Sequence, residues 1–276
     1  MSAATKRSVG IIGLGAMGLG VARSLLRAGF AVHACDMRAE VLATIASEGG
    51  QPHQTPASLA AQVDALIVLV VNAEQTDAVL FGEHGAAPLM KKGSVVIASS
   101  TVPPHYAEEL GGKLASLGLH HLDAPVSGGA ARAASGEMTI MASGAPAPFE
   151  AVQDVLDAIS IKVYRLGEAS GMGSKVKMIN QLLAGVHIAA ATEAMALGIR
   201  AGINPETLYE VISNSAGASW MFQNRVPHIL AGDYKPLSAV NIFVKDLGIV
   251  LDSARKLTFP LPLTSAAHQM YLATSA

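Results

Sequence analysis

A glycine-rich turn directly after the first apolar segment constrains the fold of this chain more than any other feature. The pattern G-x-G-x-x-G follows the segment Val9–Ile12, and the residues after it place apolar side chains at helical spacing. A strand, a tight turn and a helix in this order bind the pyrophosphate of a dinucleotide, because glycines let the backbone approach and the helix N-terminus meets the negative charge. The pattern therefore predicts a dinucleotide site formed by Gly13, Leu14, Gly15, Ala16, Met17 and Gly18.

An acidic residue at the end of the next apolar segment indicates which dinucleotide is bound. Asp36 follows the segment Ala31–Cys35 and lies 18 residues beyond Gly18. A carboxylate at this place accepts hydrogen bonds from the adenosine ribose and repels a 2′-phosphate, which favours NAD over NADP. Arg38 leaves NADP open, because a guanidinium can hold a 2′-phosphate. An ordinary turn or capping role is the alternative interpretation of Asp36.

Short apolar segments alternate with helical patterns from Ser8 to about Leu166, and this alternation predicts a parallel α/β sheet. The segment Ala65–Val71 is apolar at every position, as expected of a strand buried on both faces. We therefore expect a doubly wound Rossmann domain over residues 1–168. Its predicted strands are Val9–Ile12, Ala31–Cys35, Ala65–Val71, Val95–Ala98 and Leu119–Leu122.

The character of the chain changes after the predicted sheet. From about Gly173 to Ala201 the residues are helix-forming and include no proline, so a single helix of about 43 Å is expected. Beyond it, glycine and proline separate several shorter helical segments. We expect an all-α domain over residues 169–276, joined to the first domain by a long helix at about 173–201.

Composition excludes several classes of function. Cys35 is the only cysteine, which excludes an internal disulfide and a cysteine-based zinc site and fits a reducing cytoplasm. A net charge of −2 without charged blocks gives no basis for binding nucleic acid or an anionic membrane. No uninterrupted apolar run of about 18 residues and no export signal are found. His120 and His121 point to opposite faces of a strand, so no metal site is expected. A cytoplasmic protein that acts on a small molecule is predicted.

Four short motifs together resemble the signatures of the β-hydroxyacid dehydrogenases, in the order and at the spacing of that family. The family includes 3-hydroxyisobutyrate dehydrogenase, tartronate semialdehyde reductase and, more distantly, 6-phosphogluconate dehydrogenase, and the resemblance covers essentially the whole chain. It implies an NAD(P)-dependent dehydrogenase of small hydroxy acids that forms homodimers or homotetramers. The motifs are G-L-G-A-M-G at 13–18, D-A-P-V-S-G-G at 123–129, G-M-G at 171–173 leading to Lys177, and K-D-L at 245–247.

By this resemblance Lys177 is the general acid/base, which exchanges a proton with the substrate hydroxyl. That role requires a lysine whose pKa falls toward the working pH, which burial beside a cationic nicotinamide would accomplish. Lys177, Asn180 and Gln181 stand at i, i+3 and i+4 and share a helix face. The resemblance assigns the two amides to the substrate, although several relatives have asparagine where Gln181 stands. A solvated surface lysine is the alternative.

The serine and glycines of the second motif resemble the family's clamp for the substrate carboxylate. In such a clamp the hydroxyl of Ser127 and exposed N–H groups near Gly128 and Gly129 meet an anion without an arginine. Taken without the family, Ser-Gly-Gly is a flexible turn.

Three further positions correspond to cofactor-binding residues of the family. Asn72 and Thr101 follow predicted strands at the sheet edge where ligands gather, and the family places these positions near the nicotinamide half of the cofactor. Either side chain is otherwise a helix cap. Lys245 resembles the family's second lysine, which closes over cofactor and substrate, and its alternative is a lysine on a helix surface.

Segments of the second half are similar to those of the L-threonate dehydrogenases within this family, which oxidise a four-carbon sugar acid at C2. Ser219, Gln223 and Asn224 offer the polar groups that such a substrate needs, whereas Trp220 and Phe222 are expected in the core. The alternatives are reduction of a small semialdehyde or 2-keto acid, 3-hydroxyisobutyrate oxidation, or a non-catalytic nucleotide-binding scaffold. The similar segments are 219–228, 233–234, 238–240 and 242–247.

Overall fold

The structure is a computed structural model that describes residues 7–234 and 239–276, and it divides into two compact units. The first unit is Met1–Lys177 and the second is Met178–Ala276. The division falls inside one continuous helix, α9 (Met172–Arg200), whereas the boundary expected from the sequence precedes that helix.

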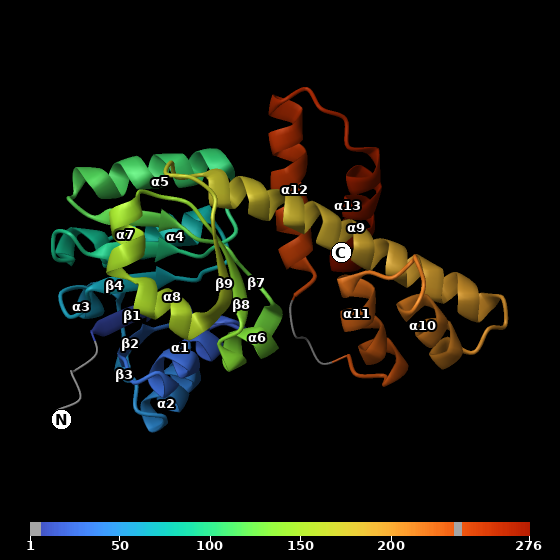
Figure 1. The fold of residues 1–276 in the computed structure, drawn as a ribbon, viewed down its shortest axis with the longest axis horizontal. Helices are drawn as coiled ribbons and strands as arrows, with labels where there is room; N and C mark the ends of the chain where they lie inside the picture. The colour runs from blue at the N-terminus through green and yellow to red at the C-terminus, as the bar shows by residue number, and fades with distance from the viewer. Residues whose placement is uncertain (1–6, 235–238) are drawn as a thin grey trace. The chain divides into compact units, whose positions relative to one another are not determined.

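The first unit contains the doubly wound parallel sheet that the sequence predicts (Figure 1). Its six strands lie in the order β3-β2-β1-β4-β5-β6, and all neighbours in this sheet are parallel. The strand order reverses between β1 and β4, and ligands of such sheets bind beyond the carboxyl ends of the strands at this reversal. The strands are β1 (Ser8–Ile12), β2 (Ala31–Cys35), β3 (Gln51–His53), β4 (Ala65–Val68), β5 (Val95–Ala98) and β6 (His120–Asp123).

Helices cover both faces of this sheet, because successive apolar side chains along each strand point to opposite faces. Ile11 and Ile67 pack against one group of helices, whereas Leu66 and Val68 pack against the other. All four residues of β4 are buried, as the apolar run predicts. The first face carries α1 (Gly18–Arg27) and α2 (Ala39–Ser47), and the second carries α3 (Pro56–Ala60), α4 (Ala73–Phe81), the short 3-10 helix η1 (Ala87–Leu89) and α5 (Pro104–Ser116).

Two differences from the predicted strands have local causes. β4 ends at Val68 rather than Val71, because the N–H groups of Val70 and Val71 donate to side chains. Val70 N donates to Ser100 Oγ, and Val71 N donates to Gln75 Oε1. β3 has no apolar pattern and lies at the sheet edge, where a proline is tolerated.

A second, three-stranded sheet completes the first unit, and the predicted strands did not include it. β8 pairs antiparallel with β7 and parallel with β9, and the β7 pairing places Ser127 opposite Thr139. The elements of this part are β7 (Val126–Ser127), α6 (Gly129–Ser135), β8 (Met138–Ala142), α7 (Pro146–Ala151), α8 (Gln153–Ile159) and β9 (Ser160–Arg165).

The second unit is all-α in its described residues, as predicted. Asn204 and Ser219 cap two of its helices by accepting hydrogen bonds from Thr207 N and Phe222 N. Gly185 of α9 lets α12 approach closely, since a Cβ there would lie 2.8 Å from Leu247 Cδ2. Besides α9, the helices are α10 (Pro205–Ser213), α11 (Trp220–Leu230), α12 (Asn241–Lys256) and α13 (Pro262–Ser275).

His121 of β6 makes the stability of the first unit depend on pH. Its side chain is buried, Nδ1 contacts Ser170 Oγ at 2.9 Å, and Nε2 lacks a hydrogen-bond partner among the described residues. Burial lowers the pKa of the imidazole to about 4. Since the folded-state pKa lies below the unfolded value of about 6.5, the contribution of His121 is complete above that pH and is lost as the pH falls toward 4.

Between pH 7 and pH 4.5 we expect this residue alone to lower the free energy of unfolding by about 2 to 3 kcal/mol. Urea unfolding of the native chain and of His121→Gln at both pH values measures the difference, and His120→Gln, at the exposed neighbouring position, is the control. The same loss of stability in the native chain and in His121→Gln would show that protonation of His121 does not matter.

Candidate active site

The glycine turn after β1 is shaped by its own backbone. Gly13 has a φ of +94° and donates from N to Cys35 O at 3.0 Å. A Cβ on Gly13 would lie 2.5 Å from Leu69 O, and one on Gly18 would lie 1.9 Å from Gly13 O. A Cβ on Gly15 would meet no atom within 4 Å. Two glycines are thus required by the fold, and the third leaves the backbone open on one side.

This turn fits the pyrophosphate of a dinucleotide. The N-terminus of α1 carries no side-chain cap and no acidic residue in its first turn, so no side chain competes there with an anion. Gly15, where a Cβ would meet no atom, precedes the first residue of α1 by three positions. Residues Gly13 to Gly18 therefore have the shape and polarity that NAD or NADP needs at this position.

Asp36 lies directly after β2 and is tied to the same turn. Its Oδ2 accepts from Leu14 N at 2.7 Å, and its Oδ1 accepts from Arg38 N and Arg38 Nε at 2.9 Å. Burial disfavours the charged carboxylate, but the hydrogen bonds from Arg38 and Leu14 outweigh this effect and hold the pKa of Asp36 below its usual value. Asp36 is therefore a carboxylate at neutral pH, and Arg38 is held beside it.

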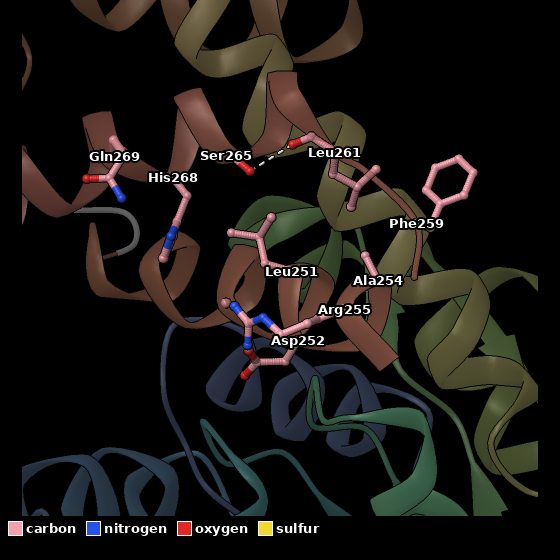
Figure 2. A pocket seen from close by; sticks show the side chains of 10 residues that line it. Leu251, Asp252, Ala254, Arg255, Phe259, Leu261, Ser265, His268 and Gln269 are labelled. Atoms are coloured by element: carbon pink, nitrogen blue, oxygen red, sulfur yellow. Dashed lines mark hydrogen bonds and ion pairs between the residues drawn. The ribbon is translucent and has the colours of Figure 1, made fainter. Parts of the chain in front are cut away.

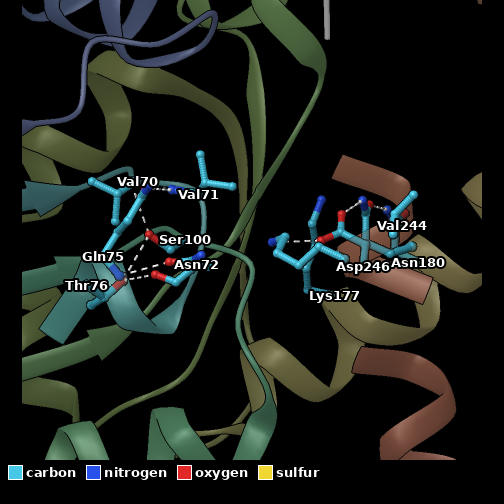
Figure 3. Close-up of polar contacts among 12 residues, drawn as sticks. Val70, Val71, Asn72, Gln75, Thr76, Ser100, Lys177, Asn180, Val244 and Asp246 are labelled. Carbon is cyan, nitrogen blue, oxygen red and sulfur yellow. Dashed lines mark hydrogen bonds and ion pairs between the residues drawn. The ribbon is translucent and has the colours of Figure 1, made fainter. Parts of the chain in front are cut away.

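The loops after β4 and β5 are joined by side-chain hydrogen bonds (Figure 3). Asn72 Oδ1 accepts from Gln75 N at 2.8 Å and so caps α4, as the alternative reading of this residue expects. Thr76 Oγ1 donates to Asn72 O at 2.8 Å and contacts Ser100 Oγ at 3.4 Å. Thr101 follows Ser100 and is partly buried. Contact of Asn72 or Thr101 with a cofactor stays a prediction.

Lys177 lies beside the predicted carboxylate clamp. Its side chain is only 6% exposed, and Nζ donates to Val126 O at 2.8 Å. The residue after Val126 is Ser127, and Gly128 and Gly129 have φ angles of +139° and +72°, which favour glycine. Within the first unit the structure thus brings together the predicted acid/base and the predicted anion-binding turn.

A second polar cluster lies in the second unit and joins α9 to α12 (Figure 3). Gln181 Nε2 donates to Asp246 Oδ2 at 2.5 Å, and Asn180 Nδ2 donates to Gln181 Oε1 at 3.0 Å. Lys245 Nζ lies 2.8 Å from Asp246 Oδ1, an ion pair without hydrogen-bond geometry. Asp246 is 2% exposed. Asn180, Gln181 and Lys245 were predicted as site residues from the sequence, whereas Asp246 was not. Its position in the K-D-L motif at 245–247 could have indicated it.

The residues at the start of α11 meet the sequence expectations only in part. The hydroxyl of Ser219 is used as the cap of α11. Phe222 is buried as expected, whereas Trp220 is 48% exposed, so the expectation of a core position for Trp220 was wrong. Ser238 lies outside the described residues.

Two cavities in the described part of the chain are lined by other residues. One, of about 460 Å³, lies between α12 and α13 and is lined by Arg255, Phe259 and His268 among others (Figure 2). The other, of about 500 Å³, is lined by residues of α5 and β6 and of the loop before α9. Within 7–234 and 239–276, no group of three or more His, Cys, Asp or Glu side chains is arranged to hold a metal ion.

Comparison with known proteins covers the whole chain. Residues 8–167 match the NAD binding domain of 6-phosphogluconate dehydrogenase, and residues 171–276 match the family described as NAD-binding of NADP-dependent 3-hydroxyisobutyrate dehydrogenase. An L-threonate dehydrogenase of Cupriavidus necator is 66% identical over 98% of this chain and 91% of the relative. One of Escherichia coli is 51% identical over 100% of this chain and 91% of the relative.

A solved structure supports the same grouping. The crystal structure of a 3-hydroxyisobutyrate dehydrogenase from Salmonella typhimurium is 52% identical and superposes with a TM-score of 0.93, covering 98% of this chain and 94% of that one. The chain is therefore similar along its whole length to dehydrogenases that use a nicotinamide cofactor.

Proposed function

The chain belongs to the β-hydroxyacid dehydrogenase family, which makes it an NAD(P)-dependent oxidoreductase, and we propose that it oxidises L-threonate at C2 to the 2-keto acid with NAD. The observation that carries the substrate is the 66% identity, over 98% of this chain, to an L-threonate dehydrogenase. The observation that carries the chemistry is a buried lysine whose Nζ lies beside the Ser127-Gly128-Gly129 turn.

The proposed reaction needs one proton acceptor from the protein. The C2–H bond breaks and its electron pair leaves as hydride, while the C2 hydroxyl proton passes to the neutral amine of Lys177 and the C2–O bond becomes a carbonyl. NAD, when bound, supplies the hydride acceptor. The hydrogen bond from Lys177 Nζ to Val126 O fixes the direction of the amine, and burial keeps water from competing for the proton.

In this proposal different residues bind the carboxylate and the hydroxyl groups of the substrate. Ser127 and the N–H groups of the glycine turn after it would hold the carboxylate, since they meet an anion without a second positive charge. Asn180 and Gln181 would accept and donate hydrogen bonds with the hydroxyls. Lys245, which forms an ion pair with Asp246, would bind the cofactor.

The experiment that tests this proposal is steady-state NADH formation from L-threonate, D-erythronate, 3-hydroxyisobutyrate and glycerate. We expect kcat/KM for L-threonate to exceed that for each of the others by at least about tenfold, which corresponds to one well-placed hydrogen bond to a hydroxyl. Oxidation of none of the sugar acids by the folded protein would remove the L-threonate proposal.

A second candidate, 3-hydroxyisobutyrate or a small semialdehyde as substrate, is favoured by the 52% identity to a 3-hydroxyisobutyrate dehydrogenase structure. The same substrate panel, run in reverse with NADH and tartronate semialdehyde, glyoxylate or succinic semialdehyde, separates it from the first. A non-catalytic scaffold would show no turnover in either direction, and the buried Lys177 argues against it.

We propose that Asp36 selects NAD over NADP. Asp36→Ala removes the carboxylate that would bond the ribose hydroxyls and frees Arg38 for a 2′-phosphate. We expect kcat/KM for NAD to fall by about tenfold to a hundredfold and that for NADP to fall less or to rise. Glu83→Ala, at an exposed position after α4, is the control and should keep the native preference. An equal loss with both cofactors would mean that Asp36 only supports the turn.

We further propose a cytoplasmic homo-oligomer that buries α9. In the described part of the chain α9 is the helix whose length and composition would also suit a membrane span, and little of its most apolar stretch is buried. His187 and Glu193 interrupt the apolar part of this helix, and such groups are costly in lipid. Ile179, Leu183, Leu197 and Ile199 are each about half exposed or more, which a second copy of the chain would cover. Light scattering of the purified protein without detergent tests the oligomer, and fractionation of the cells that produce it tests the location.

A further inference from the structure

The first turn of α9 is fastened to a buried carboxylate that the proposed reaction does not use. Asp123, the last residue of β6, is 1% exposed. Its Oδ2 accepts from Gly171 N and Ser174 N, each at 2.9 Å, and from Ser143 Oγ at 3.3 Å. Its Oδ1 accepts from Ser174 Oγ at 2.7 Å. The N–H partners can only donate, so the arrangement is one that a carboxylate satisfies.

The glycines before Lys177 make this attachment close. A Cβ on Gly173 would lie 2.4 Å from Met141 O and 2.6 Å from Asp123 O, so only glycine lets the helix start against these strands. Gly171 has a φ of +98°, and Gly173 N donates to Ser143 Oγ at 3.1 Å. The G-M-G motif is therefore the surface on which α9 meets β6 and β8.

Lys177 follows this attachment by three residues, less than one turn of helix. Its Nζ bonds Val126 O, and Val126 follows Asp123 by three residues. The segment 123–126 thus holds the helix backbone at one end and the lysine amine at the other. A shift of the helix start would move Nζ relative to Val126 and the adjoining Ser127.

We propose that Asp123 is a positioning residue for Lys177, which it places by fixing the first turn of α9 on Ser143, Gly171 and Ser174. This inference rests on the proposed role of Lys177 as acid/base. Asp123 acts through the helix and touches no reacting atom. Its negative charge also lies at the positive end of the helix dipole.

The other titratable groups packed about this turn have partners of their own. Glu108 of α5, whose side chain lies next to Gly171, pairs with Lys175 at 2.9 Å. His121 is bonded to Ser170 and has its pKa lowered by burial. Burial raises the pKa of Asp123, and the hydrogen bonds from Ser174, Gly171 and Ser143 oppose that effect.

The first measurement needs no substrate. Trace acetylation of the protein with acetic anhydride across a pH series, followed by mass spectrometry of the Lys177 peptide, gives the pH at which this amine becomes nucleophilic. Asp123→Asn keeps the shape but removes the charge that favours the ammonium, so we expect the midpoint to move to lower pH. Asp157→Asn, which removes an exposed carboxylate on α8, should leave the midpoint unchanged.

The second measurement uses the substrate on which the native chain is most active. We expect Asp123→Asn to lower kcat by about tenfold to a hundredfold, with KM changed less, because misplacement of the amine affects the transition state more than binding. The acidic limb of the kcat/KM profile should move in the same direction as the acetylation midpoint. A purely structural role would lower the folded fraction without moving either pH value.

Ser174→Ala keeps the proposal testable if Asp123→Asn does not fold. It removes one bond to Asp123 and leaves the Ser174 N–H, so we expect kcat to fall by about threefold to tenfold with the fold retained. Native kcat and native acetylation midpoint in the folded variants would overturn the proposal. Failure of the native chain to oxidise L-threonate would count against the proposed substrate only, because the acetylation series reports the environment of the Lys177 amine without any substrate.

Discussion

Lys177→Ala is expected to lower kcat for hydroxy-acid oxidation by about a thousandfold, the central value for removal of a positioned acid/base group. The side chain is buried, and its Nζ is directed by Val126 O toward the turn that would hold the substrate carboxylate. KM for NAD should stay within about twofold, since the glycine turn and Asp36 are untouched. The measurement is NADH absorbance with the best substrate of the panel, together with NAD titration by fluorescence.

A neighbouring lysine provides the control for this experiment. Lys175 lies two positions earlier on α9, is half exposed and pairs with Glu108. Lys175→Ala should keep kcat within about twofold, because an exposed ion pair contributes little. If Lys177→Ala kept more than about a tenth of native kcat, another group would have to accept the proton and the proposed mechanism would be wrong.

Two substitutions in the glycine turn are expected to separate folding from cofactor binding. Gly18→Ala would place a Cβ 1.9 Å from Gly13 O, a backbone atom that cannot move without opening the turn. We expect a loss of about 3 kcal/mol in the free energy of unfolding and no measurable NAD binding. Thermal unfolding and fluorescence titration with NAD measure both quantities.

Gly15→Ala is the matched variant with the opposite pattern. No protein atom lies within 4 Å of the added Cβ, so the melting temperature should stay within about 2 °C of the native value. The methyl group enters the space that the pyrophosphate would occupy, and the Kd for NAD should rise by about tenfold to a hundredfold. Native affinity in Gly15→Ala would show that the dinucleotide does not lie against this turn.

The parts of the fold that the sequence predicts well are those with a local cause. The segments Ala31–Cys35 and Val95–Ala98 are β2 and β5 without change, and the helix predicted at about 173–201 is α9. Continuous apolar runs between turn residues and a proline-free helical stretch are determined by neighbouring residues. The second sheet was missed because β9 is partly exposed along its length and its residues alternate only weakly.

The site was predictable where a motif lies within one turn of the chain. The pattern of Gly13, Gly15 and Gly18 has a steric reason that is visible in the sequence alone. The attachment of Asp123 to Ser174 and the bond from Gln181 to Asp246 join residues that are 51 and 65 positions apart. No periodicity connects such residues, so their partners appear only when the strands and helices are packed.

The continuous course of α9 across the division of the chain limits how the protein can be recombined with its relatives. The selectivity determinant proposed at the end of β2 lies in one exchangeable module, so cofactor preference can be transplanted by itself. A crossover placed at 177/178 would instead cut between Lys177 and the amides of Asn180 and Gln181, inside one hydrogen-bonded helix. Chimaeras that inherit α9 together with Asp123 and Ser143 from a single parent should therefore be active far more often than those that split them.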